Sequence, residues 1–341
     1  MISIAQATTS HIRKVNVRRD LQEIADLIEL CFAATLDDDG RDYLRHLRTA
    51  ARDMAYLSWL QSAAERIATP LYGYVWEEDN RIIGNLSLVP MTRFGRITYL
   101  IANVAVHPQY RRRGIGRQLT QTAIDHLRRR GIESAWLQVR DDNPVAVHLY
   151  QSLGFQERAR RTTWQSSASP AQTHLRAEGV TVHKRKLQDW GQQSALLQQI
   201  YPPEVAWNLP IKFSRLSPSP LNQVLRWLQN EPQQSWTARS GETPIGYLTW
   251  EPSRSSSDCL WLAAEPQHDE AAILSLLPHA RRVLSRRGRP LSVNYPAGRG
   301  SEAFLRAGFA HHQTLIWMEV PLLTYPLKDM GGAASAPHSE A

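Results

Sequence analysis

Cysteine is nearly absent from the sequence, which has two among 341 residues, Cys31 and Cys259. They lie far apart, and neither belongs to a Cys-x-x-Cys or Cys/His spacing, so neither a disulfide framework nor a zinc site is indicated. Long apolar runs are missing too, because no stretch approaches the about 18 residues that a membrane helix needs. Residues 1–15 lack the apolar core of a signal peptide. We therefore expect a cytoplasmic protein with no membrane partner.

The bulk composition is that of a globular protein. Hydrophobic residues make up 42% of the chain and charged residues 21%, which supports a sizeable core. The length of 341 residues exceeds the roughly 100 to 200 of a single domain, so two domains are expected. The formal net charge of +8 fits nucleic acid, an anionic membrane surface or an anionic small ligand, and charge alone does not choose among them.

Hydrophobic periodicity divides the first half into helices and strands. Apolar residues at helical spacing predict an amphipathic helix over residues 21–32, behind a short first strand. Three apolar runs separated by turn residues predict an antiparallel meander. The predicted strands cover residues 71–76, 82–89, 98–106 and 134–139, and the other predicted helices cover residues 41–67, 114–130 and 144–153.

Short segments of the first half recur in the same order in the second half. Residues 81–86 resemble 243–248, residues 106–108 resemble 264–266, and residues 153–155 resemble 307–309. Three matches in order favour a duplicated domain. We predict a first domain over residues 1–165, a Ser-, Ala- and Pro-rich linker over 166–178, a second domain over 179–326 and a disordered tail over 327–341.

One stretch of the first half has the pattern of a phosphate site. The predicted strand that ends near Val106 runs into an arginine-rich turn with Gly114 and Gly116, which opens the next helix. A helix N-terminus presents unpaired backbone N–H groups and a partial positive charge. Glycine lets the backbone approach phosphate oxygens closely, and arginines add positive charge around them. The pattern therefore predicts a pyrophosphate at this turn.

Two motifs resemble the GNAT superfamily of N-acetyltransferases. Arg111, Gly114 and Gly116 match the Gln/Arg-x-x-Gly-x-Gly/Ala signature, and residues 143–155 match the Asn-x-x-Ala-x-x-Leu-Tyr-x-x-x-Gly-Phe element at every fixed position. The close resemblance covers residues 82–155. It implies an α/β (α+β) fold of two tandem GNAT-like domains, each a mixed, mostly antiparallel sheet flanked by helices, with a parallel strand pair that splays apart.

The resemblance also implies which residues act. Acetyl-CoA is the implied co-substrate, with no metal. Backbone groups of the strand would bind the acetyl-pantetheine arm, the arginine-rich turn the pyrophosphate, and Asn143 the pantetheine. Tyr150 would lie near the sulfur, where a phenol can protonate the departing thiolate as a general acid. The implied cofactor-binding residues are Val104, Ala105, Val106, Arg111, Arg112, Arg113, Gly114, Ile115, Gly116, Arg117 and Asn143.

The general base is not evident from the sequence. The first half resembles N-terminal acetyltransferases of ribosomal proteins, in which the Leu-x-Val-Arg element often carries Glu, whereas this chain has Gln138. An amide cannot accept a proton at neutral pH. A proton could instead pass through water to Glu77, Glu78 or Asp141, although a solvated surface role is the simpler interpretation of each acid. His107, before a proline at a strand end, is interpreted as a turn residue.

The second half departs from the motif. Residues 267–270 read Gln-His-Asp-Glu, with no glycine and with acids that would repel phosphate, and Phe304 replaces the tyrosine. We expect a degenerate copy that helps to form the acceptor pocket or is purely structural. The predicted activity is acetyl transfer to a primary amine by direct attack in a ternary complex. A protein N-terminus, a lysine or a small amine could be the acceptor.

Two other classes of function stay open, and so does the oligomeric state. The first is a non-catalytic acyl-CoA-binding regulatory module, which Gln138 favours and Tyr150 opposes. The second is nucleic-acid binding, which the arginines would explain, but no recognised nucleic-acid motif accompanies them. We therefore expect acetyl-CoA and an amine acceptor as partners of the chain, and regard nucleic acid as the less favoured partner.

Overall fold

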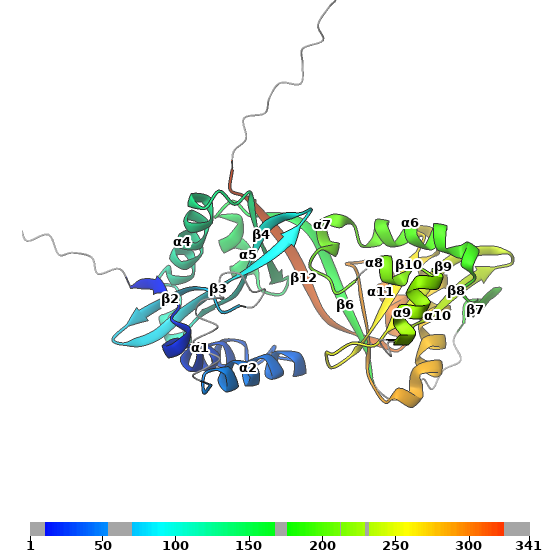
Figure 1. The fold of residues 1–341 in the computed structure, drawn as a ribbon, viewed down its shortest axis with the longest axis horizontal. Coiled ribbons are helices and arrows are strands. Elements are labelled where there is room, and N and C mark those ends of the chain that lie inside the picture. Colours follow the sequence, from blue (N-terminus) through cyan, green and yellow to red (C-terminus); the bar gives the residue numbers. More distant parts are fainter. Residues whose placement is uncertain (1–10, 54–69, 168–175, 212, 229–231, 324–341) are drawn as a thin grey trace, which may run out of the picture.

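The structure is a computed structural model that describes residues 11–53, 70–167, 176–211, 213–228 and 232–323. Two halves lie side by side and are joined by two long strands, β6 and β12, that run between them (Figure 1). The first half runs from β1 to β6 and the second from β7 to β12. No helix within these ranges is long and apolar enough to cross a membrane.

The first half follows the predicted order of elements. A helix begins at Val17 because Asn16 caps it, its side chain accepting from the Arg18 amide. Asp37 caps the next helix through the Gly40 amide, so that helix begins before the predicted residue 41. Residues 54–69, the rest of that prediction, lie outside the described residues. The elements are β1 (Ile12–Lys14), α1 (Val17–Phe32), α2 (Asp38–Ala50), β2 (Gly73–Glu78), β3 (Arg81–Arg93), β4 (Arg96–Val106), α4 (Ile115–Arg129), β5 (Ser134–Arg140), α5 (Pro144–Gln151) and β6 (Gln156–Ser166).

The second half repeats the plan with extra short helices before its meander. Its elements are β7 (Val180–Lys184), α6 (Trp190–Ile200), α7 (Pro203–Ala206), α8 (Phe213–Leu216), α9 (Pro220–Leu228), β8 (Gln234–Ser240), β9 (Thr243–Glu251), β10 (Asp258–Ala264), α10 (Asp269–Leu284), β11 (Leu291–Pro296), α11 (Ser301–Arg306) and β12 (Phe309–Pro321).

All twelve of these strands form one sheet, in the order β1-β2-β3-β4-β5-β12-β6-β11-β10-β9-β8-β7. The meanders β2-β3-β4 and β8-β9-β10 are antiparallel, while β4 with β5 and β10 with β11 are parallel. The predicted mixed, mostly antiparallel sheet flanked by helices is therefore confirmed. In the first half α4 and α5 cover one face and α1 and α2 the other (Figure 1).

The halves exchange their last strands. The final strand of the second half, β12, lies between β5 and β6, and β6 in turn lies between β12 and β11. Ile316, Met318 and Val320 of β12 are therefore buried in the core of the first half, together with α1 and α4. Trp164 of β6 is buried in the core of the second half, where it stacks on Phe304 with ring centroids 4.9 Å apart.

The predicted division of the chain between residues 165 and 179 stays a prediction, although each core is completed by a strand from the other half. Most of the predicted linker, residues 168–175, and the predicted tail, residues 327–341, lie outside the described residues.

Candidate functional site

Two parallel strands of the first half separate toward their carboxyl ends. β4 and β5 pair from Tyr99 and Ala135 to Ile101 and Leu137, but the strands continue to Val106 and Arg140. Residues 102–106 of β4, named here the open stretch, therefore have β3 on one side and no strand partner on the other. Backbone groups on this edge that make no hydrogen bond within the sheet can bind an extended ligand with amides. The predicted residues Val104, Ala105 and Val106 belong to this stretch.

A bulge marks the beginning of the open stretch. The register of β3 against β4 shifts between Asn85 and Ser87, and Asn103 takes a left-handed conformation with φ 51°. The Asn85 Nδ2 donates to the Asn103 carbonyl at 2.9 Å and holds it there. Asparagine tolerates this conformation better than most residues. Bulges bend the strand that contains them, and this one lies just beyond the last pair between β4 and β5.

The N-terminus of α4 begins beyond the end of β4. Gly114, the residue before Ile115, has φ 78°, and no side chain caps the helix there. Arg112, two residues earlier, also has a positive φ of 67°. Uncapped first-turn N–H groups next to left-handed residues form a concave anion-binding turn. Ile115 is buried and anchors the helix below this turn.

The four predicted arginines have different surroundings. Arg111 Nε donates to the Val106 carbonyl at 3.2 Å, which joins the turn to the end of β4. Arg113 pairs with Glu78 at 3.0 Å, and Arg117 donates to the Ser152 hydroxyl beyond the end of α5. Arg112 is exposed. Arg111 thus joins the turn to the open stretch, and Arg117 joins α4 to the end of α5.

The second predicted motif forms α5. Asn143 caps this helix, because its Oδ1 accepts from the Ala146 amide at 3.1 Å. Tyr150 is buried and packs edge-on against Phe155, with ring centroids 5.8 Å apart. Burial raises the pKa of the Tyr150 phenol to about 12. The hydroxyl therefore carries its proton at neutral pH, as a general acid must.

The acids considered above as acceptors of the amine proton are poorly suited to act as a general base. Arg13 bonds to Glu77 and Arg113 bonds to Glu78, and these bonds hold the pKa of each carboxyl below its usual range. Asp141 is exposed at the end of β5, and Gln138 lies opposite Trp317 of β12. His107 precedes the short turn that follows β4, as its interpretation as a turn residue requires.

In the second half, a carboxylate of the protein lies at the helix N-terminus that corresponds to the N-terminus of α4. β10 and β11 separate after Cys259 and Ser292, as β4 and β5 do. At the N-terminus of α10, however, the Asp269 carboxylate accepts from Tyr295 Oη at 2.7 Å and from Arg299 Nε at 2.6 Å. An anion is therefore already supplied by the helix itself, and a second anion would be repelled.

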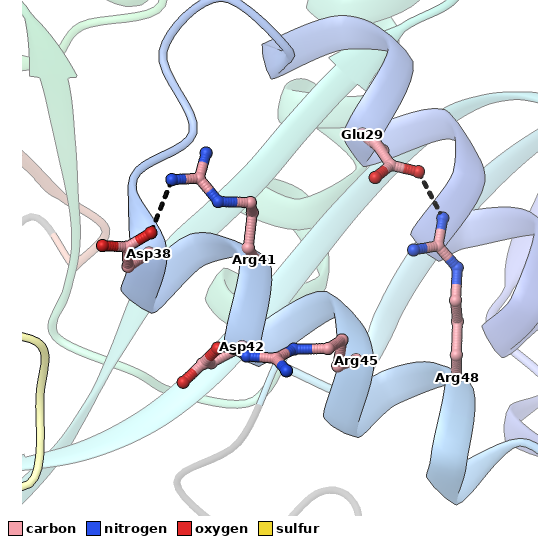
Figure 2. A pocket seen from close by; sticks show the side chains of 6 residues that line it. All are labelled: Glu29, Asp38, Arg41, Asp42, Arg45 and Arg48. Atoms are coloured by element: carbon pink, nitrogen blue, oxygen red, sulfur yellow. Dashed lines mark hydrogen bonds and ion pairs between the residues drawn. The ribbon is translucent and has the colours of Figure 1, made fainter.

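The structure also contains a hollow away from these strands. Figure 2 shows it between α1 and α2, lined by charged side chains only. Arg41 pairs with Asp38 and Arg48 with Glu29, each at 2.6 Å. The charges are already paired within the protein, so the hollow is a solvated salt-bridge surface. Within the described ranges, no group of three or more His, Cys, Asp and Glu side chains could hold a metal.

The sequence analysis missed the residues on the α2 side of the open stretch. Tyr43 of α2 accepts a hydrogen bond from Asn103 Nδ2 at 3.0 Å, and Asp37 contacts His312 of the second half at 3.3 Å. An asparagine in the middle of an apolar strand was the signal available for Asn103, because asparagine in such a place often marks a bulge. No local signal links residues 37 and 312.

Comparisons with known proteins identify relatives of this chain. The family model described as Acetyltransferase (GNAT) family matches residues 23–155. The [Ribosomal protein bS18]-alanine N-acetyltransferase of Escherichia coli K12 is 47% identical over 62 residues, which are 18% of this chain and 42% of that protein. The chain thus matches less than half the length of this relative. N-alpha-acetyltransferase RimI of Mycobacterium tuberculosis is 33% identical over 124 residues, 36% of this chain and 77% of that protein.

A solved structure resembles the fold of both halves together. The crystal structure of a GCN5-related N-acetyltransferase from Sphaerobacter thermophilus aligns with 92% of this chain and 96% of its own, with a TM-score of 0.57 and 14% identity. At that identity the likeness concerns the fold alone. Together with the match of residues 23–155 and the similarity to the mycobacterial relative, it leads to one assignment. The chain belongs to the GNAT family of acetyltransferases.

Proposed function

We propose that this chain is an acetyl-CoA-dependent N-acetyltransferase that acts on a primary amine. The observation that carries the proposal is the place of the uncapped N-terminus of α4, which Arg111 joins to the open stretch of β4. A nucleotide pyrophosphate suits the first feature and an amide-containing arm suits the second. Acetyl-CoA contains both a pyrophosphate and an amide-containing arm.

Acetyl-CoA would be held mainly by backbone groups. Residues 104–106 would bind the pantetheine arm along the unpaired edge of β4, and N–H groups of residues 112–117 would hold the pyrophosphate. Asn143 caps α5 with its Oδ1, which leaves its amide nitrogen to meet the arm. Because the Gly114 backbone is left-handed and has no side chain, the phosphates can approach the turn closely.

The chemistry assigned to the chain is a proton transfer. Acetyl-CoA supplies an activated thioester; the amine nitrogen bonds to the acetyl carbon as the carbon–sulfur bond breaks. The leaving thiolate takes a proton from Tyr150, whose phenol is protonated at neutral pH, and water returns to Tyr150 the proton that the amine gives up. The attacking amine loses its proton to water, because Gln138 cannot accept it and Glu77 and Glu78 are engaged by arginines.

The acceptor we favour is a protein or peptide N-terminus. The relatives named above include a ribosomal-protein alanine N-acetyltransferase and an N-alpha-acetyltransferase, and the family model matches residues 23–155, within the first half. A lysine side chain or a small amine is a second possibility of the same chemistry. We place the reaction in the cytoplasm, where the two unpaired cysteines would stay reduced.

A non-catalytic acyl-CoA-binding module is the competing candidate. It is favoured by Gln138 and by the lowered pKa values of Glu77 and Glu78, which leave no obvious general base. The presence of Tyr150 at the fixed position of the Asn143–Phe155 motif argues for turnover instead.

A thiol-release assay with acetyl-CoA and a panel of peptides and amines separates the two candidates. In the Tyr150→Phe variant we expect kcat to fall about 100-fold or more, the usual effect of a lost general acid, with acetyl-CoA affinity unchanged. Tyr99→Phe is the matched control, since Tyr99 is also buried but lies in the paired part of β4. Acetyl-CoA binding without turnover on any acceptor would leave the binding module as the better description.

A further inference from the structure

Helix α2 contacts the open stretch of β4 through one hydrogen bond. Asn103 Nδ2 donates to Tyr43 Oη at 3.0 Å, and the Asn103 backbone is the left-handed residue of the bulge. α2 lies on the face opposite α4 and α5 (Figure 1). α2 therefore borders the open stretch on that face.

The Tyr43 hydroxyl has a hydrogen left to donate. Its oxygen accepts from Asn103, and among the described residues no atom accepts the hydroxyl hydrogen. Burial raises the pKa of the Tyr43 phenol above its ordinary value, so the hydrogen stays in place at neutral pH. Tyr43 can thus donate a hydrogen bond to a ligand beside the bulge.

The second half holds the N-terminus of α2. Asp37 Oδ1 accepts from the Gly40 amide at 2.8 Å, while its Oδ2 lies 3.3 Å from Nε2 of His312 on β12. The hydrogen bond with His312 lowers the pKa of the Asp37 carboxyl. A second contact lies nearby, where the Ser256 amide donates to Asp39 Oδ1 at 2.7 Å. One residue, Asp37, therefore joins the helix cap to the second half.

The same strand of the second half borders the other side of the opening. Trp317 and Leu315 of β12 pair with Gln138 and Arg140 of β5, beyond the last pair between β5 and β4. β12 thus contacts β5 through its ladder and α2 through His312. β12 therefore helps to set the distance between α2 and β5, together with α1, on which α2 also packs.

We infer that the second half positions α2 for binding of the acceptor amine: His312 is a positioning residue that acts through Asp37, and Tyr43 donates a hydrogen bond to the acceptor. The inference rests on the proposed function and gives the degenerate half a role in it. It requires no cofactor in the second half, in keeping with the Asp269 carboxylate at the N-terminus of α10.

The test uses full-length protein and three measurements. Amide hydrogen exchange of residues 38–50 reports the position of α2, steady-state kinetics with a peptide that begins with alanine reports acceptor binding, and calorimetry reports acetyl-CoA binding. The variants are His312→Ala, His312→Gln, Asp37→Asn and Tyr43→Phe. His311→Ala is the matched control, because His311 is the neighbour on β12 but bonds to Thr314.

In His312→Ala we expect exchange in α2 and the peptide KM each to rise about 3-fold, the effect of losing a half-exposed pair, while acetyl-CoA affinity is unchanged. His312→Gln, which can still donate, should restore both values. Asp37→Asn should behave as His312→Ala does, because asparagine keeps the helix cap but loses the charge. Tyr43→Phe loses the bond to Asn103 as well as the hydrogen-bond donor, so it should raise the peptide KM more than His312→Ala does. His311→Ala should change neither exchange nor the peptide KM.

Unchanged α2 exchange in His312→Ala would overturn the positioning role. Faster exchange with an unchanged peptide KM would overturn the link to the acceptor. If wild-type protein binds acetyl-CoA but acetylates neither this peptide nor any amine, the proposed function itself fails and the acceptor role fails with it; the exchange data then still decide whether His312 holds α2.

Discussion

Replacing Gly114 by alanine tests whether the turn before α4 holds the pyrophosphate. Gly114 has φ 78°, and a Cβ added there would meet nothing closer than Gln118 Nε2 at 3.8 Å. The substitution is therefore free of steric clash. It asks an alanine to keep a left-handed conformation, which disfavours the native turn by about 1 kcal/mol.

Gly131 provides a control with the same strain. It follows the other end of α4, has φ 69°, and a Cβ there would have no neighbour within 4 Å. We expect Gly131→Ala and Gly114→Ala to lower the free energy of unfolding by similar amounts, about 1 kcal/mol each. Only Gly114→Ala should also displace N–H groups from the phosphates, and losing one charge-assisted hydrogen bond, worth about 1.5–3 kcal/mol, weakens affinity roughly 10- to 100-fold.

Urea unfolding and calorimetric titration with CoA measure the two effects separately. The expected pattern is equal destabilisation of both variants and a loss of CoA affinity in Gly114→Ala alone. If Gly114→Ala unfolds like Gly131→Ala yet binds CoA as wild type does, the turn is an ordinary helix start, and the assignment of residues 112–117 to the pyrophosphate is wrong.

Three further predictions concern the rest of the molecule. Calorimetry should find one CoA site per chain, because Asp269 and Arg299 already pair at the second helix N-terminus; a second site would contradict this. Met318→Ala, on the exchanged strand, should lower the free energy of unfolding by about 2–5 kcal/mol, measured by urea titration, since Met318 is fully buried in the first core. Burial alone would raise the pKa of the Asp20 carboxyl, but hydrogen bonds from Arg13 and from the Asn16 amide leave it lowered. The ionised Asp20 carboxyl therefore stabilises the fold at pH values above its ordinary pKa, and this stabilisation is lost as pH falls through the lowered pKa. The difference in free energy of unfolding between wild type and Asp20→Asn, measured by urea unfolding at several pH values, should therefore shrink in acid.

The elements of the first half could be predicted because each carries its own local signal. The helix over Ile115–Arg129 shows apolar residues at helical spacing and ends near Gly131, so periodicity and the cap agree. The turn at Gly114 is similarly local, since glycine is the residue that accepts its backbone conformation. Both features are encoded within about one or two helical turns of sequence.

The strand exchange could not be predicted, because register between distant strands has no local signal. The sequence of β12 shows alternating apolar residues, but the identity of Ile316 and Met318 does not indicate that β12 pairs with β5 and β6. The contact between Asp37 and His312 depends on that exchange and was missed for the same reason. Arg299 as partner of Asp269 was missed too, because that pairing depends on the path of the chain after β11.

The exchanged strand also bears on how the protein is made. During synthesis the first half leaves the ribosome with the place between β5 and β6 empty, and the strand that fills it is encoded at residues 309–321. Pairings over such a sequence distance form late, because a long loop must close first. The first half, which carries the GNAT motif, therefore completes its sheet only after the second half has been translated. Until then one edge of β5 has no strand partner.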